Sequence, residues 1–104
     1  MITVNVLYKN STSIKFNMSY YLDTHIPLVR RLLGAVLKGV LVQQGSGGGA
    51  PGTPPEYAVI TVLSFESMES FQKAFLPQAA AITADIANFT NVEPTIQFSD
   101  VRLG

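Results

Sequence analysis

The side chains best suited to chemistry are concentrated in one short stretch, residues 20–28, which reads YYLDTHIPL. It contains two adjacent tyrosines, Tyr20 and Tyr21, the only histidine of the chain, His25, and Pro27. Imidazole titrates near neutral pH and therefore suits general acid or base catalysis. A phenol can donate a hydrogen bond to an oxygen atom on which negative charge develops. These residue types point to proton-transfer chemistry that uses no cofactor.

A helix over residues 17–33 is expected to carry this stretch. Asn17 is a suitable N-cap, Phe16 can pack on Tyr21 at the fourth helical position, and Gly34 suits the C-terminal end. Apolar residues recur along it every three or four positions, which predicts one buried stripe that includes the histidine. The members of this stripe are Met18, Tyr21, Leu22, His25, Leu28, Val29 and Leu32.

Pro27 should disturb this helix close to the histidine. Its ring nitrogen cannot donate to the carbonyl group of Asp23, and Ile26 before it is expected to leave helical geometry. One interpretation is that the helix simply breaks and His25 is a core residue bonded to a backbone carbonyl group. The other is that the break turns His25 toward a cavity, where the tyrosines and the freed carbonyl group fix its tautomer. The sequence leaves both open.

Four strands and a second helix complete the expected elements. The second helix follows a Ser67 N-cap and continues as an apolar stripe to Phe89, with Pro77 kinking or restarting it. Segment 45–55 is rich in glycine and proline, which is typical of a flexible connection. The expected strands are 2–8, 36–44, 56–65 and 93–103.

The order βαββαβ predicts an α+β, ferredoxin-like domain over residues 1–104, with a four-stranded antiparallel sheet and two helices on one face. Strand 56–65 is apolar on both sides, so the open sheet face needs a cover. We expect a homodimer, a dimeric α+β barrel whose sheets enclose a chamber beside His25. There Thr3 and Asn5 would anchor a ligand, or would lie at the wet margin of the interface.

Composition argues against several classes of function. Charged residues make up only 13% of the chain and the formal net charge is zero, so nothing predicts binding to nucleic acid. Without cysteine and with one histidine, a metal site is not expected, and no cofactor motif is present. The sequence shows no secretory leader and no apolar run long enough to span a membrane, so we expect a cytoplasmic protein.

Two segments resemble the EthD family, which is named for ethyl tert-butyl ether degradation. FNMSYYLDTHIPL resembles the family signature F-D-x-x-Y-Y-x-x-x-H-x-P-L, and ADIANFT resembles its A-D-I-P-N-F-T segment. From its residues alone, Asn88-Phe89-Thr90 in the second segment could be a site element or a helix end, and we favour the helix end. The resemblance implies a dimeric α+β barrel in a small-molecule, often catabolic context, within a superfamily of isomerases, cyclases and monooxygenases that use no metal or flavin. It also implies that Tyr20, Tyr21, His25 and Pro27 lie at the site.

Two functions follow as hypotheses. In the first, the protein binds a small apolar or aromatic oxygenated metabolite and catalyses isomerisation, cyclisation or dehydration, with His25 and Tyr21 as catalytic groups. In the second, it is a non-catalytic carrier or scavenger of hydrophobic intermediates accessory to an oxygenase, and His25 only donates a hydrogen bond. The expected substrate-binding residues are Tyr20, Asn5, Thr3 and Pro27.

Overall fold

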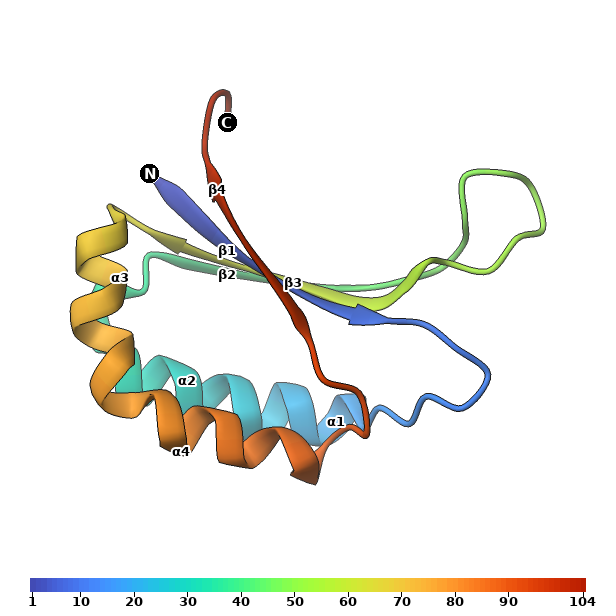
Figure 1. Cartoon of the computed structure of the whole chain (residues 1–104), viewed down its shortest axis with the longest axis horizontal. Coiled ribbons are helices and arrows are strands. Elements are labelled where there is room, and N and C mark those ends of the chain that lie inside the picture. The colour runs from blue at the N-terminus through green and yellow to red at the C-terminus, as the bar shows by residue number, and fades with distance from the viewer.

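A computed structural model describes all 104 residues as a four-stranded antiparallel sheet with its helices on one side (Figure 1). The strand order is β2-β3-β1-β4, so β1 and β3 form the centre of the sheet. The strands are β1 (Ile2–Lys9), β2 (Gly39–Gln44), β3 (Tyr57–Phe65) and β4 (Thr95–Asp100). This arrangement confirms the predicted α+β, ferredoxin-like fold.

Two helical segments cover the same side of the sheet, and each consists of consecutive turns of different types. The first contains α1 (Met18–Tyr20), the π-helical turn η1 (Tyr21–His25), α2 (Ile26–Leu33) and the 3-10 turn η2 (Gly34–Val36). The second contains α3 (Met68–Phe75), the 3-10 turn η3 (Leu76–Gln78), α4 (Ala79–Ala84) and the 3-10 turn η4 (Asp85–Asn88). No helix has the length and apolar character needed to cross a bilayer.

The ends and breaks of these helices follow the sequence signals. The Asn17 side chain accepts a hydrogen bond from the Tyr20 amide at 3.0 Å, and the Ser67 side chain accepts one from the Ser70 amide at 3.1 Å. Gly34 ends α2 with φ of 64°, a left-handed conformation that favours glycine. Pro77 lies in η3 and separates α3 from α4, so the predicted interruption is confirmed.

The central strand β1 presents different side chains to the two faces of the sheet. Ile2, Val4 and Tyr8 are buried against the helices, whereas Thr3 and Asn5 alternate with them and point to the open face. We call these the covered face and the open face. The covered face carries the hydrophobic core, because the apolar sides of both helical segments pack there.

The open face is apolar over β2, β3 and the end of β1. The register pairs Val62 with both Asn5 and Leu41, and pairs Ile60 with Leu7, so these side chains share this face. Leu41 is 55% exposed in the single chain. The prediction that β3 is apolar on both sides is therefore confirmed.

Two strands are shorter than predicted. β2 begins at Gly39, because residues 34–36 form the 3-10 turn η2 after the glycine. β4 covers Thr95–Asp100 only; its last residue pairs with Ile2, the first residue of β1, so the ladder ends there.

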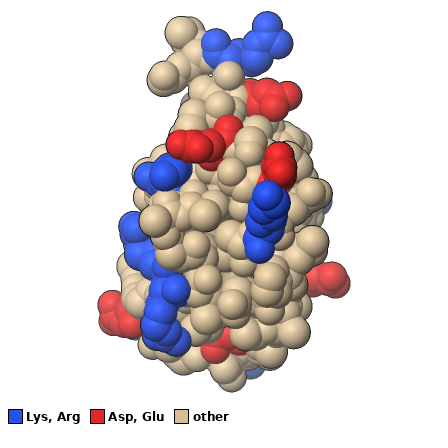
Figure 2. Space-filling model, turned by 90° about the vertical axis from the view of Figure 1, so that its left-hand side faces the viewer, with Lys and Arg blue, Asp and Glu red and all other residues tan.

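The surface carries few charges. Figure 2 views the molecule from the side that carries α3 and shows a mostly uncharged surface with a few blue and red side chains, several of the blue ones along its left edge. The two signs are interspersed and no broad patch of one charge forms on this side.

Candidate functional site

Pro27 widens the helix one turn before its own position. The Ile26 amide bonds to the Tyr21 carbonyl group, five residues back, which makes residues 21–25 a π-helical turn. Pro27 then lies in the first turn of α2, where a missing N–H group is tolerated. The expectation that Ile26 leaves helical geometry is wrong: its φ of −61° and ψ of −44° are helical. The extra residue in the turn accommodates the proline without a break.

The wide turn decides which side chains face the sheet. Tyr21 and His25 are both buried, and their rings stack with centroids 5.5 Å apart and planes 15° from parallel. Leu22 is 46% exposed, so its predicted place in the buried stripe is wrong. The stripe assumed a regular α-helix, and inserting a residue into one turn changes the direction in which that side chain points.

The histidine is bonded to a carboxylate from the second helical segment. His25 Nδ1 lies 2.8 Å from Asp85 Oδ2. The Tyr20 hydroxyl group donates to Asp85 Oδ1 at 2.7 Å, and Asn88 Nδ2 donates to the same oxygen at 3.0 Å. Asp85 and Asn88 are three residues apart in a 3-10 turn, where such side chains lie one above the other. Asp85 therefore accepts three hydrogen bonds.

These contacts fix the tautomer of the imidazole. Burial alone would raise the pKa of Asp85, but the hydrogen bonds from Tyr20, Asn88 and His25 outweigh it and hold the pKa below the ordinary value of 3.8. At neutral pH Asp85 is thus a carboxylate that only accepts, so the proton between the pair resides on Nδ1 of His25. In neutral His25, the lone pair of Nε2 is then free to act as a base.

His25 lines a cavity between the sheet and the helices. The cavity has a volume of about 480 Å³, and His25, Tyr21 and Thr61 line it. Every fully buried side-chain nitrogen or oxygen atom has a hydrogen-bond partner, whereas Nε2 has none, so Nε2 is not sealed in the core. Both interpretations of His25 are wrong about its partner: the Asp85 carboxylate fixes the tautomer, not a backbone carbonyl group and not the tyrosines with a freed carbonyl group. The second interpretation is right that His25 lines a cavity.

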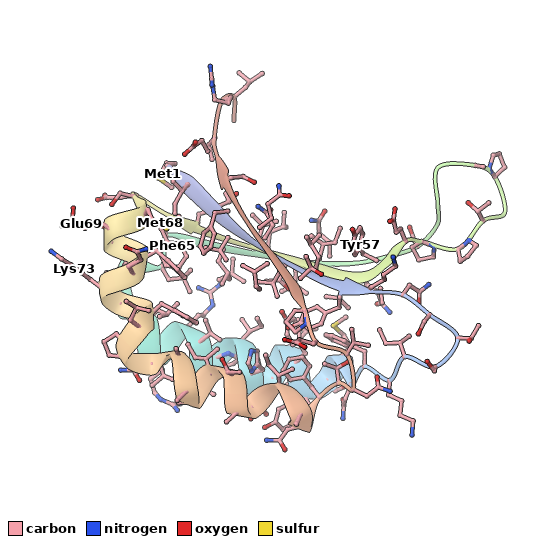
Figure 3. The ribbon with its side chains drawn as sticks, in the orientation of Figure 1. Met1, Tyr57, Phe65, Met68, Glu69 and Lys73 are labelled. Carbon is pink, nitrogen blue, oxygen red and sulfur yellow. The ribbon has the colours of Figure 1, made fainter.

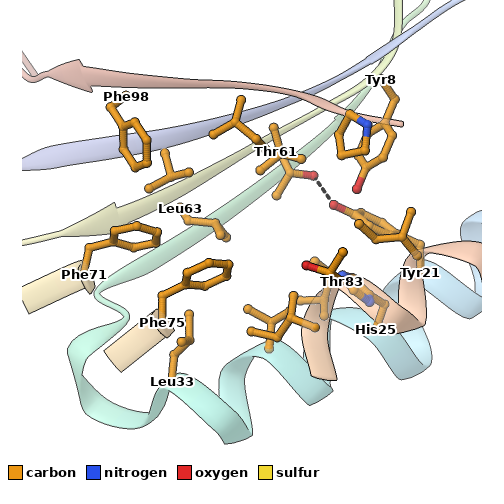
Figure 4. A pocket seen from close by; sticks show the side chains of 18 of the residues that line it. Tyr8, Tyr21, His25, Leu33, Thr61, Leu63, Phe71, Phe75, Thr83 and Phe98 are labelled. Carbon is orange, nitrogen blue, oxygen red and sulfur yellow. Dashed lines mark hydrogen bonds between the residues drawn. The ribbon is translucent and has the colours of Figure 1, made fainter. Parts of the chain in front are cut away.

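The cavity lies in a different place from the expected chamber. It belongs to the covered face of one chain (Figure 4), so the expectation that two sheets enclose a chamber beside His25 is wrong. The physical reason is topological: the crossover connections put both helical segments on one side of the sheet, and a side chain of the first segment cannot reach the other side.

A pair of hydroxyl groups lies beside the histidine. Tyr21 OH and Thr61 Oγ1 are 2.6 Å apart, as the dashed line in Figure 4 shows. Burial raises the pKa of Tyr21 despite the opposing hydrogen bond with Thr61, so the phenol stays protonated at neutral pH. The Tyr8 hydroxyl group also hydrogen-bonds to Tyr21, so the three hydroxyl groups carry three hydrogen atoms and use two among themselves. The remaining one can be donated to a ligand in the cavity.

The cavity has a polar and an apolar end (Figure 4). His25, Tyr21 and Thr61 mark the polar end, and the apolar end is formed by aromatic rings. The rings of the apolar end belong to Phe71, Phe75 and Phe98.

The sequence-predicted site residues divide into two groups. His25 and Tyr21 line the cavity. Tyr20 binds Asp85 instead, and the same hydrogen bond is the main reason why the pKa of Tyr20 is raised. Pro27 is exposed and does not line the cavity.

Thr3 and Asn5 lie on the opposite face of the sheet. Asn5 Nδ2 donates to Thr3 Oγ1 at 3.2 Å and to Ser99 Oγ at 3.0 Å, so these polar groups satisfy one another on the open face. None of the four residues expected to bind substrate, Thr3, Asn5, Tyr20 and Pro27, lines this cavity, and their role in binding a ligand stays a prediction.

Sequence reasoning missed the residues that hold the histidine in place. Besides Asp85, the Phe89 ring lies 4.6 Å from the His25 ring and 4.8 Å from the Tyr21 ring, centroid to centroid. The Asn17 amide donates to the Phe89 carbonyl group at 2.7 Å, which ties the end of the second helical segment to the start of the first. The signal was the ADIANFT segment, which supplies Asp85, Asn88 and Phe89 but reads as a plain helix end.

No group of three or more His, Cys, Asp or Glu side chains is placed to hold a metal ion. The cavity instead offers an imidazole with a carboxylate partner, a shared pair of hydroxyl groups and an apolar compartment.

Comparisons with known proteins agree with this architecture. No curated protein matches the sequence. An EthD-like protein from Ralstonia eutropha JMP134 is 35% identical, with a TM-score of 0.93 over 98% of this chain and 92% of that one. An EthD family protein from Bacillus halodurans C-125 (20% identity, TM-score 0.74, 97% and 98% of the two chains) and HapK from Hahella chejuensis (13%, 0.60, 100% and 96%) share the fold. The EthD domain model matches residues 9–93. The chain belongs to the EthD family.

Proposed function

We propose that this protein catalyses cofactor-independent proton transfer on a small apolar or aromatic oxygenated metabolite bound in the cavity. The observation that carries the proposal is the 2.8 Å contact between His25 Nδ1 and Asp85 Oδ2, in a histidine that lines an apolar cavity. A base within reach of the ligand and a fixed tautomer are the requirements for general base catalysis.

The residues have distinct roles in this proposal. Nε2 of His25 removes a proton from a carbon atom next to the ligand carbonyl group, and the electron pair of the C–H bond moves to form an enolate. The free hydroxyl proton of the Tyr21–Thr61 pair donates a hydrogen bond to the enolate oxygen. Nε2 then returns the proton to a different atom of the enolate, which completes an isomerisation. Asp85 stabilises the imidazolium that forms in between.

Tyr20 and Asn88 are positioning residues, because they touch Asp85 and not the cavity wall. We further propose that the protein is a cytoplasmic homodimer joined through its open face. The support is the set of apolar side chains on that face, Leu7, Leu41, Ile60 and Val62, none of which is buried in the single chain.

The test is exchange of a carbon-bound proton for solvent deuterium. We expect the wild-type protein to accelerate exchange of the α-protons of 2-tetralone, an apolar aromatic ketone, in deuterium oxide, as measured by ¹H NMR. His25→Ala should abolish the acceleration, because the base is gone. Asp85→Asn should reduce it by about 10² to 10⁴-fold, because an amide can hold the wrong tautomer and cannot balance the imidazolium charge.

The control variant is Lys73→Ala, which removes an exposed charge on the outer side of α3 and should leave the rate unchanged. Thermal melting of each variant confirms that the fold is retained. If 2-tetralone binds but exchanges no faster than in buffer, the catalytic proposal fails and the protein is a carrier.

A further inference from the structure

We propose that the cavity selects uncharged ligands and rejects carboxylates and phosphate esters of the same shape. The preferred ligand is a flat, mainly apolar molecule with a hydroxyl or carbonyl group at one end. This inference rests on the proposed function insofar as the cavity must bind a small molecule, and it adds a rule for the charge of that molecule.

The cavity wall contains no cation to bind an anion. None of its lining residues is Lys or Arg. Apart from His25, Glu93 is the only lining residue with an ionisable acidic or basic side chain that carries a formal charge. His25 does not supply a net positive charge when protonated, because Asp85 lies 2.8 Å from its ring. With Glu93 counted, the formal charge around a bound ligand is thus negative in either state of the histidine.

Glu93 lies toward the polar end of the cavity. The register pairs Val6 with both Thr61 and Ile96, and pairs Leu7 with Thr95, so the chain before β4 continues along the sheet toward Tyr8. Glu93 is the second residue before Thr95 and is exposed, which places it at the mouth of the cavity. A carboxylate at this end would meet Glu93 and the Asp85 pair.

The opposite end suits an aromatic ring. Phe71 stacks on Phe75 with centroids 5.0 Å apart, and it meets Phe98 edge to face at 5.3 Å. These rings line the apolar end (Figure 4). Burial of an apolar ring there directs the polar end of the same ligand to His25 and the hydroxyl pair.

Because this orientation places the polar group of the ligand at the polar end of the cavity, the charge of that group affects the affinity. A neutral oxygen can accept from the hydroxyl pair at no electrostatic cost, whereas an anionic group loses its water and gains no cation. Repulsion between like charges several ångströms apart near a protein surface is enough for about a tenfold loss of affinity.

The test compares two fluorescent probes that share the naphthalene ring system, 2-naphthol and 2-naphthoate, at pH 7 and low salt. The first is neutral and the second is an anion. We expect the wild-type protein to bind 2-naphthol at least about tenfold more tightly in a fluorescence titration. Glu93→Gln should strengthen 2-naphthoate binding severalfold and leave 2-naphthol binding unchanged.

The matched control is Glu69→Gln, which changes the net charge equally. The Glu69 side chain is 78% exposed and pairs with Lys73 at 3.2 Å. Figure 3 shows both side chains on the outer side of α3, away from the space between helices and sheet. This variant should leave both affinities as they are.

A salt titration of the wild-type protein adds a second measurement. Raising the salt concentration to 0.5 M should narrow the difference between its affinities for the two probes.

Each outcome has one meaning. If neither probe binds, the proposed function fails because the cavity holds no ligand. If both bind equally in the wild type, the cavity binds small molecules and only the charge rule is overturned. If Glu69→Gln and Glu93→Gln change the ratio of affinities equally, the role of Glu93 at the mouth is overturned.

Discussion

The two faces of the sheet use the same strands for different purposes. On the covered face, Val4, Tyr8, Val59 and Phe65 are at most 4% exposed and pack under the helices. On the open face, one half is apolar and the other half carries Thr3, Asn5, Gln97 and Ser99, which bond to one another. The covered face is complete within one chain, except where it leaves the cavity, whereas the open face is not.

The contrast shows how one small chain places its candidate site on one face of the sheet and leaves the other face uncovered. The covered face provides the core, the histidine and the cavity from one sheet and two helical segments. The open face is then available for association and contributes none of the residues around His25. Stability, assembly and chemistry should therefore respond to mutations on different faces.

The largest effect should come from the core of the covered face. Phe65→Ala removes a ring that is fully buried and lies 5.0 Å from the Phe71 ring. We expect the free energy of unfolding to fall by about 3–5 kcal/mol, measured by urea denaturation.

The matching change on the open face is Leu41→Ala. Since Leu41 is 55% exposed, the free energy of unfolding should fall by less than about 1 kcal/mol at protein concentrations where the chain is monomeric. If Phe65→Ala and Leu41→Ala lowered the free energy of unfolding equally, the contrast between the packed covered face and the exposed open face would be contradicted.

The next effect concerns assembly. Val62→Arg places a charge among the apolar side chains of the open face, between Asn5 and Leu41 in the register. If two copies meet through this face, as we propose, the dimer dissociation constant should rise by at least about 100-fold, because an unpaired charge would be buried. Sedimentation velocity over a range of concentrations measures it.

The control is Ser19→Arg, which adds the same charge at an exposed position of α1 and should leave association unchanged. A wild-type chain that stays monomeric at high micromolar concentration would show that the open face is not a self-association surface.

Most of the fold could be predicted from local signals in the sequence. The alternation in β1, the N-caps Asn17 and Ser67, and the conformation of Gly34 all act within a few residues, and each is as expected. The order of strands and helices then restricts the sheet to a few possible topologies.

The candidate site was harder to predict because it depends on contacts between distant parts of the chain. His25 and Asp85 are 60 positions apart, and no local pattern joins them. The π-helical turn was also missed: the sequence predicts that Pro27 disturbs the helix, but a break and a widened turn remove the same hydrogen bond. With the widened turn, both Tyr21 and His25 pack against Phe89, a contact between distant parts of the chain.

The smallest effects on the free energy of unfolding are expected when one hydrogen-bonded polar pair is disrupted on each face. Thr61→Val leaves the buried Tyr21 hydroxyl group without its partner at 2.6 Å, so we expect a loss of about 1–3 kcal/mol in the free energy of unfolding. Tyr21→Phe combined with Thr61→Val should cost less than the two single changes added together, with a coupling energy of about 0.5–3 kcal/mol.

On the open face, Ser99→Ala removes the 3.0 Å contact with Asn5, but water can replace the lost hydroxyl group in the single chain. Ser99→Ala should therefore lower the free energy of unfolding by at most about 0.5 kcal/mol under monomeric conditions. If Thr61→Val costs no more than Ser99→Ala, then solvent reaches the hydroxyl pair beside His25 as freely as it reaches the open face. The oxygen of a ligand would then compete with water for the same proton, and the pair could not serve as a preorganised donor to an enolate.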